Sequence, residues 1–228
     1  MRKPAPEKSR ILIVDDHPLF CEGLGRMIDR HPSLKVCGQA PDAASAMRAV
    51  AELRPDLVLV DISLEGANGI DLIKSLKAKY DEIPILVVSM HDESLYAERA
   101  LRAGAQGYIM KNQSIQIVRA AIFKVLGGGI FLSEKMSTSV LAKLLRGKTD
   151  QPVSSIGQLS DRELQVFQML GEGKSSRQVA EELDLTIPTI HSFRNRIKEK
   201  LQLHNATELV LHANQWVLER DTGVKSGK

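Results

Sequence analysis

Five strand-length apolar runs, separated by segments with helical spacing, dominate the first half of the chain. The runs are 10–16, 34–40, 56–62, 84–90 and 105–111. Segments with apolar residues three or four positions apart follow each run, at 17–30, 42–53, 69–79, 93–102 and 114–126. Near-continuous apolar strands that alternate with helices are typical of a parallel sheet covered on both faces. The pattern predicts a doubly wound α/β domain, in which functional groups gather at the carboxyl ends of the strands.

The overall composition favours an ordinary globular protein over the other classes. Hydrophobic residues make up 43% of the 228 positions and charged residues 26%, and the formal charge of +3 is too small to indicate a partner. Cys21 and Cys37 offer neither a disulfide framework nor metal-ligand spacing, and we expect them to be reduced. The polar N-terminus has no apolar signal core, and the apolar runs are too short to span a membrane. We therefore expect a cytoplasmic protein with no membrane partner.

Polar residues stand at the ends of four of the predicted strands. They are Asp15 with Asp16, Asp61, Ser89 and Lys111. If these strands are neighbours, three carboxylates meet a hydroxyl and an ammonium, and the carboxylates together favour a hard cation such as Mg²⁺. A carboxylate can act as a nucleophile and form an aspartyl phosphate, whose oxygens the cation, the ammonium and the hydroxyl would bind.

A plainer interpretation exists for each of these residues. A single aspartate at a strand end is more often a helix cap or a turn residue, and a single lysine is usually solvated. The functional interpretation depends on their joint occurrence, in order, at four strand ends.

Four stretches carry a resemblance to a known family. "VDDHPLF", "LVLVDISLEGANGIDLI", "VVSMHD" and "ALRAGAQGYIMK" resemble the receiver domain of two-component response regulators, a flavodoxin-like fold, over residues 9–127. The resemblance implies that a sensor histidine kinase phosphorylates Asp61 and that Mg²⁺ is the cofactor. It gives the roles of the remaining residues: Asp15, Asp16, Asp61 and the Ser63 backbone carbonyl for the metal, Ser89 and Tyr108 as the switch pair, Lys111 for the phosphate, and Ser63 and His91 for phosphate lifetime.

The resemblance has one local departure. Receivers typically carry proline after the lysine, with a cis peptide between the two, and here Asn112 follows Lys111. A cis bond before a residue other than proline costs about 2.5–4 kcal/mol. Either the pocket tolerates that cost or Lys111 approaches the phosphate differently.

Residues 128–156 read as a linker with one helix near 134–146. The glycines at 127–129 end the last receiver helix, and Ser133 is a suitable N-cap for the next one. Residues 148–157 are polar, with proline and glycine, which is typical of a flexible linker.

The remaining part, 157–220, is predicted to be all-helical. Ser160 and Glu163 form a capping box, and a short helix and a tight turn precede a helix capped by Thr186. The stretch resembles the LuxR-type helix-turn-helix of NarL/FixJ regulators, with 186–201 as the recognition helix for double-stranded DNA. The resemblance and the polar face of this helix give the expected DNA contacts: Thr189, His191, Ser192, Arg194, Asn195, Arg196 and Lys198.

Two further features of residues 157–228 are the distribution of charge and the apolar character of the last predicted helix. Residues 157–228 hold ten basic and ten acidic residues, but four basic residues fall within 191–200, as phosphate contacts require. The predicted helix 205–219 is apolar on more than one side, which fits ordinary packing or a dimer surface, and the family favours the dimer.

Three functions remain to be compared. The leading one is a transcription regulator switched by phosphorylation, not an enzyme beyond its own phosphorylation and dephosphorylation, and a homodimer when phosphorylated. The second is a phosphatase or phosphotransferase with Asp61 as nucleophile, but "DISLE" lacks the second acid two positions on. The third is a constitutive DNA-binding protein, against which the complete set of strand-end residues argues. In the leading interpretation, phosphate draws in Ser89 and Tyr108 follows.

Overall fold

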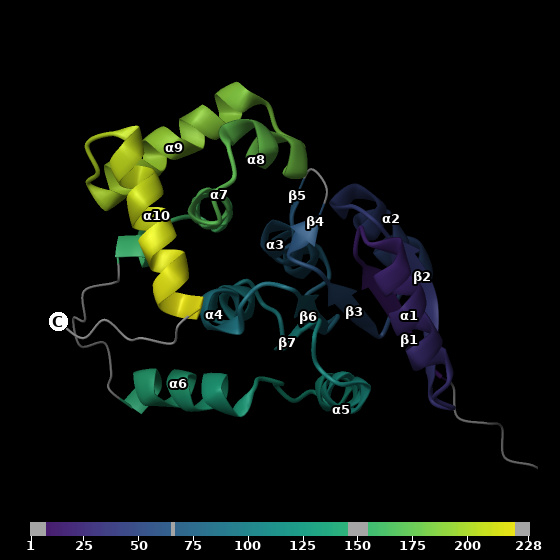
Figure 1. Cartoon of the computed structure of the whole chain (residues 1–228). Coiled ribbons are helices and arrows are strands. Elements are labelled where there is room, and N and C mark those ends of the chain that lie inside the picture. Colours follow the sequence, from purple (N-terminus) through teal and green to yellow (C-terminus); the bar gives the residue numbers. More distant parts are fainter. Residues whose placement is uncertain (1–7, 65–66, 146–154, 222–228) are drawn as a thin grey trace, which may run out of the picture. The chain divides into compact units, whose positions relative to one another are not determined.

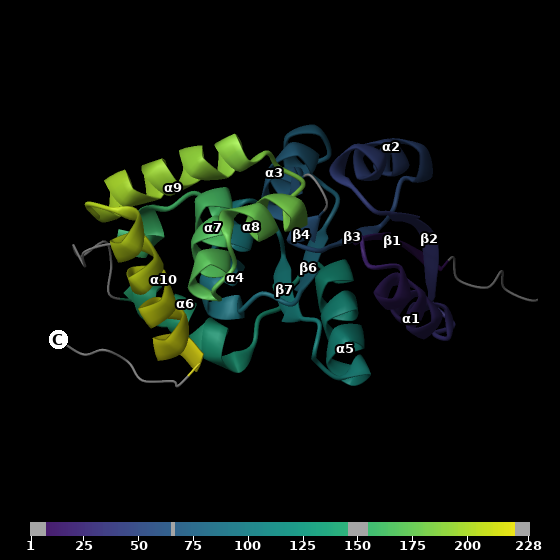
Figure 2. The same cartoon turned by 45° about the horizontal axis from the view of Figure 1, so that its top comes forward.

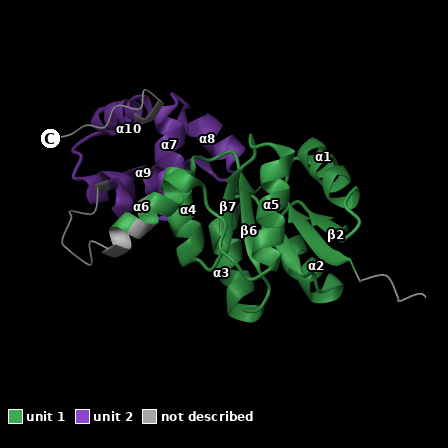
Figure 3. Ribbon diagram, turned by 90° about the horizontal axis from the view of Figure 1, so that it is seen from below, with its two compact units in different colours: residues 1–147 green, residues 148–228 purple. Residues whose placement is uncertain are grey.

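The computed structural model describes residues 8–64, 67–145 and 155–221. The chain divides into two compact units, 1–147 and 148–228, which Figure 3 colours green and purple. The first unit contains a sheet with helices and the second is helical, as the sequence predicts. Within the described residues, no helix is both long and apolar enough to cross a membrane.

The first unit is built on a five-stranded parallel sheet. Its strands are β1 (Ser9–Val14), β2 (Leu34–Ala40), β3 (Leu57–Val60), β6 (Ile85–Ser89) and β7 (Gly107–Met110), in the spatial order β2-β1-β3-β6-β7. This is the doubly wound order of flavodoxin-like folds. The prediction of five strands is confirmed, and the four whose ends carry the polar residues are neighbours. The first strand ends earlier than predicted, at Val14, so Asp15 and Asp16 stand just beyond it.

Helices cover both faces of the sheet (Figures 1 and 2). The helices α1 (Pro18–Asp29) and α5 (Ile115–Leu126) lie on one face, where Cys21, Leu24, Ile28, Val118 and Ile122 join the core side chains of the strands. The other face is covered by α2 (Ala43–Leu53), α3 (Gly69–Lys79) and α4 (Glu93–Arg102). The strands are buried on both sides, which explains their continuous apolar sequence.

A short hairpin follows β3 and shapes the segment next to Asp61. Its strands are β4 (Ser63–Leu64) and β5 (Ala67–Asn68), and they pair antiparallel. The amide of Gly69 donates to the Ile62 carbonyl over 2.8 Å, and a Cβ on Gly69 would overlap the Asp61 carbonyl oxygen. The side chain of Asn68 caps α3 by accepting from the Ile70 amide. Glycine at position 69 is therefore required by close approach of the backbone.

The segment after α5 continues along the open edge of the sheet. Phe131 bridges Gly107 in parallel, its amide donates to the Gln106 carbonyl, and its carbonyl accepts from the Tyr108 amide. Then α6 (Glu134–Leu145) begins, with Ser133 accepting from the Met136 amide as its cap. The helix belongs to the first unit and packs against α4.

The described part of the second unit, residues 155–221, contains a short 3-10 turn, η1 (Ser155–Gln158), and four helices (Figure 1). The helices are α7 (Asp161–Gly171), α8 (Ser176–Glu182), α9 (Ile187–Leu201) and α10 (Ala206–Asp221). The capping box of Ser160 and Glu163 is present, and Thr186 caps α9. The core contains Leu164, Phe167, Val179, Ile190 and Leu209, and α7 meets α10 closely where Gly171 faces Ala213.

Candidate functional site

The strand ends of the first unit bring one ammonium between two carboxylates. Lys111 Nζ lies 2.7 Å from Asp15 Oδ2 and 2.7 Å from Asp61 Oδ2, and all three side chains are nearly inaccessible to solvent. Burial opposes the charge on Lys111, but Asp61 and Asp15 outweigh it, and the pKa of Lys111 is raised. The ring of Phe20 faces the ammonium with its centroid 4.5 Å away. A buried lysine, whose charge the two carboxylates favour, therefore stands beside Asp61.

The backbone fixes the Asp61 carboxylate from its other side. Asp61 Oδ1 accepts a hydrogen bond from the Ile62 amide over 2.7 Å, while Oδ2 accepts from Lys111. The residue directly follows β3, and its own amide donates to the Val14 carbonyl of β1. The strand and the two bonds give the carboxylate a single orientation, as a nucleophile needs.

Asp15, Asp16, His17 and Asp61 each offer a ligand atom, and the four atoms lie within 4.8 Å of one another. Asp16 Oδ1 is buried and has no hydrogen-bond partner, although His17 Nδ1 lies 2.7 Å away as an ionic partner. A buried carboxylate oxygen without a donor is suited to a cation. The residues therefore fit a divalent ion, which Asp15, Asp16 and Asp61 would hold. Ser63, predicted to add its carbonyl, opens β4 two positions after Asp61.

Tyr108 points into the protein. Its side chain is buried among β6, β7 and α4, and its hydroxyl donates to the His91 carbonyl over 2.8 Å. Burial raises the pKa of Tyr108 well above its usual value, and a hydrogen bond with Ser89 opposes that rise. Ser89, the last residue of β6, is fully buried. The two residues predicted as a switch pair are thus in contact, with the tyrosine in its inward position.

Ser63 and His91 are joined directly. Ser63 Oγ and His91 Nε2 form a hydrogen bond of 2.7 Å, and the imidazole also packs on Tyr96 with ring centroids 4.7 Å apart. The bond links the segment after β3 to the segment after β6. Both residues were predicted to affect phosphate lifetime, but their direct contact was not predicted.

The peptide between Lys111 and Asn112 is trans, since the described residues contain no cis peptide. The ammonium reaches both carboxylates with this geometry. Of the two possibilities raised by Asn112, the structure has the one without a cis bond.

In the second unit, α9 presents a polar and basic surface. His191, Ser192, Asn195 and Arg196 are exposed, while Ile190, Ile197 and Leu201 are buried below them. Thr189 lies in the first turn, and its hydroxyl bonds that of Thr186 over 2.8 Å. Lys198 is half-buried in the last turn of α9. The residues predicted to contact DNA therefore share one helix, most of them with accessible side chains.

Arg194 differs from its neighbours, because its Nη1 donates to Ser176 Oγ over 2.6 Å. Ser176 is the first residue of α8, so this bond ties α8 to α9 within the helix-turn-helix. A second tie runs from Lys200 Nζ to the buried Glu163 Oε2 over 2.6 Å. These two contacts were not predicted, since their partners lie far apart in sequence.

One face of α10 is buried and the other carries exposed leucines. Leu209 and Ala213 are fully buried, and Trp216 packs on Phe167 with ring centroids 5.4 Å apart. Leu211 is 64% exposed and Leu218 is 55% exposed. The apolar character of the helix thus exceeds what packing within the unit uses.

Comparisons with known proteins agree with this geometry. Residues 11–123 match the response regulator receiver domain, and residues 157–213 match the bacterial regulatory proteins of the luxR family. Response regulator GacA of Pseudomonas aeruginosa is 31% identical over 205 residues, covering 90% of this chain and 94% of that protein. Transcriptional regulatory protein DegU of Brevibacillus brevis is 29% identical over 228 residues, covering 93% of this chain and 97% of that protein.

A solved structure shows the same fold over nearly the whole chain. RcsB of Salmonella enterica, bound to the promoter rprA in the presence of the phosphomimetic BeF3⁻, matches with a TM-score of 0.60 and 21% identity. The match covers 91% of this chain and 99% of that one. The chain belongs to the two-component response regulators and consists of a receiver domain followed by a LuxR-type DNA-binding domain.

Proposed function

We propose that Asp61 accepts a phosphoryl group from a sensor histidine kinase and that this changes how the chain binds its DNA site. The observation that carries the proposal is the Lys111 ammonium, which lies 2.7 Å from both Asp61 and Asp15 in a buried setting. A fixed cation beside a fixed carboxylate is the arrangement that phosphoryl transfer to the carboxylate requires. The protein has no other catalytic activity in this proposal than its own phosphorylation and dephosphorylation.

In the transfer, Asp61 Oδ forms a bond to phosphorus as the bond to the histidine nitrogen of the donor breaks. Lys111 and Ser89 then bind oxygens of the phosphoryl group, and Lys111 exchanges its contact with the carboxylate for one with the phosphate. Mg²⁺, held by Asp15, Asp16, Asp61 and the Ser63 carbonyl, would supply further neutralisation of the phosphoryl oxygens. Ser63 and His91 would set the phosphate lifetime.

The switch pair would transmit the change. Once Ser89 bonds the phosphoryl group, its bond with Tyr108 is altered, and Tyr108 already lies inward, bonded to the His91 carbonyl. Phosphate can shift the equilibrium only by the extent to which it stabilises one arrangement over another. In this proposal phosphorylation favours the arrangement in which Tyr108 is inward, the position it has in the structure.

The output would be sequence-specific binding of double-stranded DNA by α9. His191, Ser192 and Asn195 are placed to contact bases, with Thr189, Arg194, Arg196 and Lys198 near phosphates. The support is that α9 exposes its polar side and buries its apolar side. The exposed Leu211 and Leu218 of α10 support a homodimer that pairs two recognition helices. A cytoplasmic location belongs to the proposal, since free Cys21 and Cys37 stay reduced there.

The first test is a mass measurement. The protein is incubated with Mg²⁺ and acetyl phosphate, and intact mass and oligomeric state are recorded for the wild type, Asp61→Asn and Asp71→Asn. Asp71 is an exposed carboxylate of α3 paired with Lys74, so it serves as a matched control. We expect a phosphate-sized gain and a shift to dimer in the wild type and in Asp71→Asn only. A gain in Asp61→Asn equal to that of the wild type would contradict the proposal.

The second test measures the affinity for DNA. The phosphorylated protein is first used to select a binding site from random duplexes. Asn195→Ala is expected to lower affinity for that site by about 1–3 kcal/mol and to relax the preference at one base pair. Asp71→Asn, the control of the mass measurement, changes an exposed side chain of the first unit and should leave affinity unchanged. Equal affinities for all three proteins would argue against α9 as the recognition helix.

A further inference from the structure

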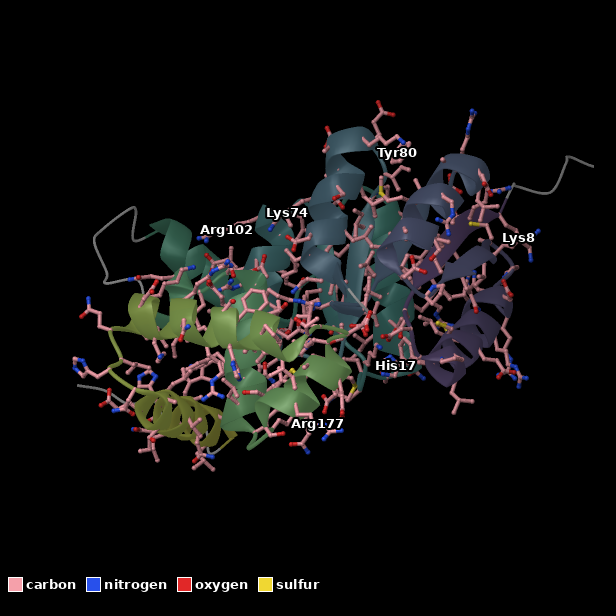
Figure 4. The ribbon with its side chains drawn as sticks, turned by 90° about the horizontal axis from the view of Figure 1, so that it is seen from above. Lys8, His17, Lys74, Tyr80, Arg102 and Arg177 are labelled. Carbon is pink, nitrogen blue, oxygen red and sulfur yellow. The ribbon has the colours of Figure 1, made fainter. Side chains whose placement is uncertain are left out.

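We propose that His17 supplies an imidazole ligand to the cation site, which makes the site favour first-row divalent transition ions over Mg²⁺ more than an all-oxygen site would. The inference rests on the proposed function, which places a cation at Asp15, Asp16 and Asp61. His17 stands at the start of α1 and is labelled in Figure 4. It was absent from the predicted metal ligands, although "DDH" places it next to two of them.

The distances fit a shared ion. His17 Nδ1 lies 2.7 Å from Asp16 Oδ1 and 3.0 Å from Asp15 Oδ1. Around an octahedral ion with bonds of about 2.1 Å, neighbouring ligand atoms are about 3.0 Å apart and opposite ones about 4.2 Å apart. The four ligand atoms of Asp15, Asp16, His17 and Asp61 lie within 4.8 Å of one another, so small adjustments bring them to one ion.

Lys111 leaves this part of the cluster open. Its ammonium bonds Asp15 Oδ2 and Asp61 Oδ2, whereas His17 faces Asp15 Oδ1 and Asp16 Oδ1. The two basic groups therefore use different oxygens of Asp15. Asp16 Oδ1, the oxygen nearest to the imidazole, is the buried one without a hydrogen-bond partner. The imidazole thus faces the two carboxylate oxygens that Lys111 does not contact.

The His17 ring bonds a carboxylate of the cluster, Asp15 Oδ1, over 3.0 Å, and it has no capping role in α1. It occupies the N-cap position of α1, but its side chain makes no capping hydrogen bond, and 62% of that side chain is exposed. The backbone amide of His17 already donates to Asp15 Oδ1 over 2.9 Å, which holds the turn without the ring. Imidazole nitrogen is a good ligand for transition ions and a poor one for Mg²⁺. Its position beside the carboxylates would change which ions the site prefers.

The experiment loads the full-length protein with Mn²⁺ at about pH 8. Pulsed electron paramagnetic resonance then reports whether a nitrogen is bound to the ion, and competition with Mg²⁺ gives the two affinities. The variants are His17→Ala, His91→Ala and His31→Ala. His91 bonds Ser63, two positions after Asp61, and His31 follows the other end of α1 and packs on Phe123.

We expect a nitrogen signal in the wild type, His31→Ala and His91→Ala, and its loss in His17→Ala. The Mn²⁺ affinity of His17→Ala should fall on the order of tenfold, while its Mg²⁺ affinity stays within about twofold of the wild type. A Mn²⁺-bound wild type without nitrogen coordination, or a signal that survives in His17→Ala, would overturn the inference and leave the proposed cation site intact. A wild type that binds neither ion would overturn both.

Discussion

Ser63 Oγ and His91 Nε2 form a hydrogen bond of 2.7 Å between the segments that follow β3 and β6. Asp61 stands two positions before Ser63, and Ser89 two positions before His91. The carbonyl of the same histidine accepts from Tyr108, so His91 contacts both the phosphorylation segment and the switch residue. A change in this hydrogen bond would therefore affect both the phosphoryl group and Tyr108.

The first prediction concerns phosphate lifetime. Ser63→Ala and His91→Ala each remove one partner of this bond, and loosening the segment beside Asp61 should give water better access to the phosphoryl group. A hydrogen bond of ordinary strength, about 0.5–1.5 kcal/mol, corresponds to roughly a two- to tenfold faster decay. Phosphorylation by acetyl phosphate should change less. The measurement is the decay of the phosphorylated mass with time in each variant.

A double variant tests whether the two residues act through their shared bond. If they do, Ser63→Ala with His91→Ala decays no faster than either single variant, because the second change removes nothing further. Ser75→Ala, whose hydroxyl bonds only the Asp71 carbonyl on α3, is the control and should decay as the wild type does. Decay rates that multiply in the double variant would show two independent effects instead.

The second prediction concerns Gly69. A Cβ at this position would overlap the Asp61 carbonyl oxygen and press on the Ile62 Cα, and both contacts are with backbone. Gly69→Ala must therefore displace the segment that carries Asp61. We expect a loss of about 2 kcal/mol or more in the free energy of unfolding of the first unit, together with weaker Mg²⁺ binding and slower phosphorylation. Urea unfolding and titration with Mg²⁺ measure these effects.

Gly23→Ala provides the contrast. Gly23 lies inside α1, and a Cβ there meets nothing within 4 Å. Alanine is the better helix former by roughly 0.5–1 kcal/mol, so this variant should be as stable as the wild type or more so. If both variants lost the same stability, close approach at Gly69 would not be the cause.

The sequence predicted the five strands and the helix caps because those features depend on neighbours in the chain, although the four strands next to the polar residues end one or two residues earlier than predicted. Val14, Val60 and Met110 end strands where polar residues follow, and Ser160 and Glu163 lie three positions apart in a capping box. The strand order was not predicted. The polar residues were expected to meet only if their strands are neighbours, and the structure shows that they are. The convergence of Asp15, Asp61 and Lys111 then follows from the parallel sheet.

The contacts that escaped prediction join residues that periodicity does not relate. Ser63 and His91 are 28 positions apart, and Lys200 reaches Glu163 across 37. The inward position of Tyr108 depends on a side-chain rotamer, which no pattern of apolar residues encodes. Phe131 lies on the edge of β7 because Gly107 leaves room there. Neither residue alone predicts that pairing.

The third prediction concerns the acid stability of the second unit. Burial tends to raise the pKa of Glu163, but the hydrogen bonds from Lys200 and Ser160 outweigh it and the pKa is lowered. Because the folded state holds the carboxylate more firmly ionised than the unfolded state, this stability is present above the unfolded pKa of about 4.3. It is lost as the pH falls through the lower folded pKa. Glu163→Gln should abolish that part of the pH dependence.

Trp216 provides the measurement, since it is the chain's single tryptophan and packs on Phe167 in the second unit. Its fluorescence during urea unfolding reports the stability of that unit at each pH. At neutral pH we expect Glu163→Gln to cost about 1–2 kcal/mol, less than a fully buried pair would, because the Lys200 side chain is 38% exposed. Glu181→Gln, which loses only an exposed pair with Arg177, should change little. If the free energy of unfolding of Glu163→Gln depended on pH as that of the wild type does, Glu163 would not be the source of this pH dependence.

The fourth prediction concerns the start of α6. Ser133 Oγ donates to Glu93 Oε1 over 2.6 Å and also accepts from the Met136 amide, so one hydroxyl caps α6 and ties it to the first residue of α4. Ser133→Ala removes both bonds. We expect faster amide hydrogen exchange in α6, by roughly fivefold or more for a cap worth about 1 kcal/mol.

Two further variants separate the cap from the tie. Glu93→Gln keeps the cap but weakens the charge-assisted bond to Ser133, so it should raise exchange in α6 less than Ser133→Ala does. Thr138→Ala removes a hydroxyl that bonds only the Glu134 carbonyl within α6, and should leave exchange near the wild-type rate. Because Phe131 is bonded to the backbone of Tyr108 just before this helix, phosphorylation should also change exchange in α6 of the wild type. Exchange in α6 that is the same in all variants and in both phosphorylation states would show that this helix is held by other contacts and does not respond to the switch.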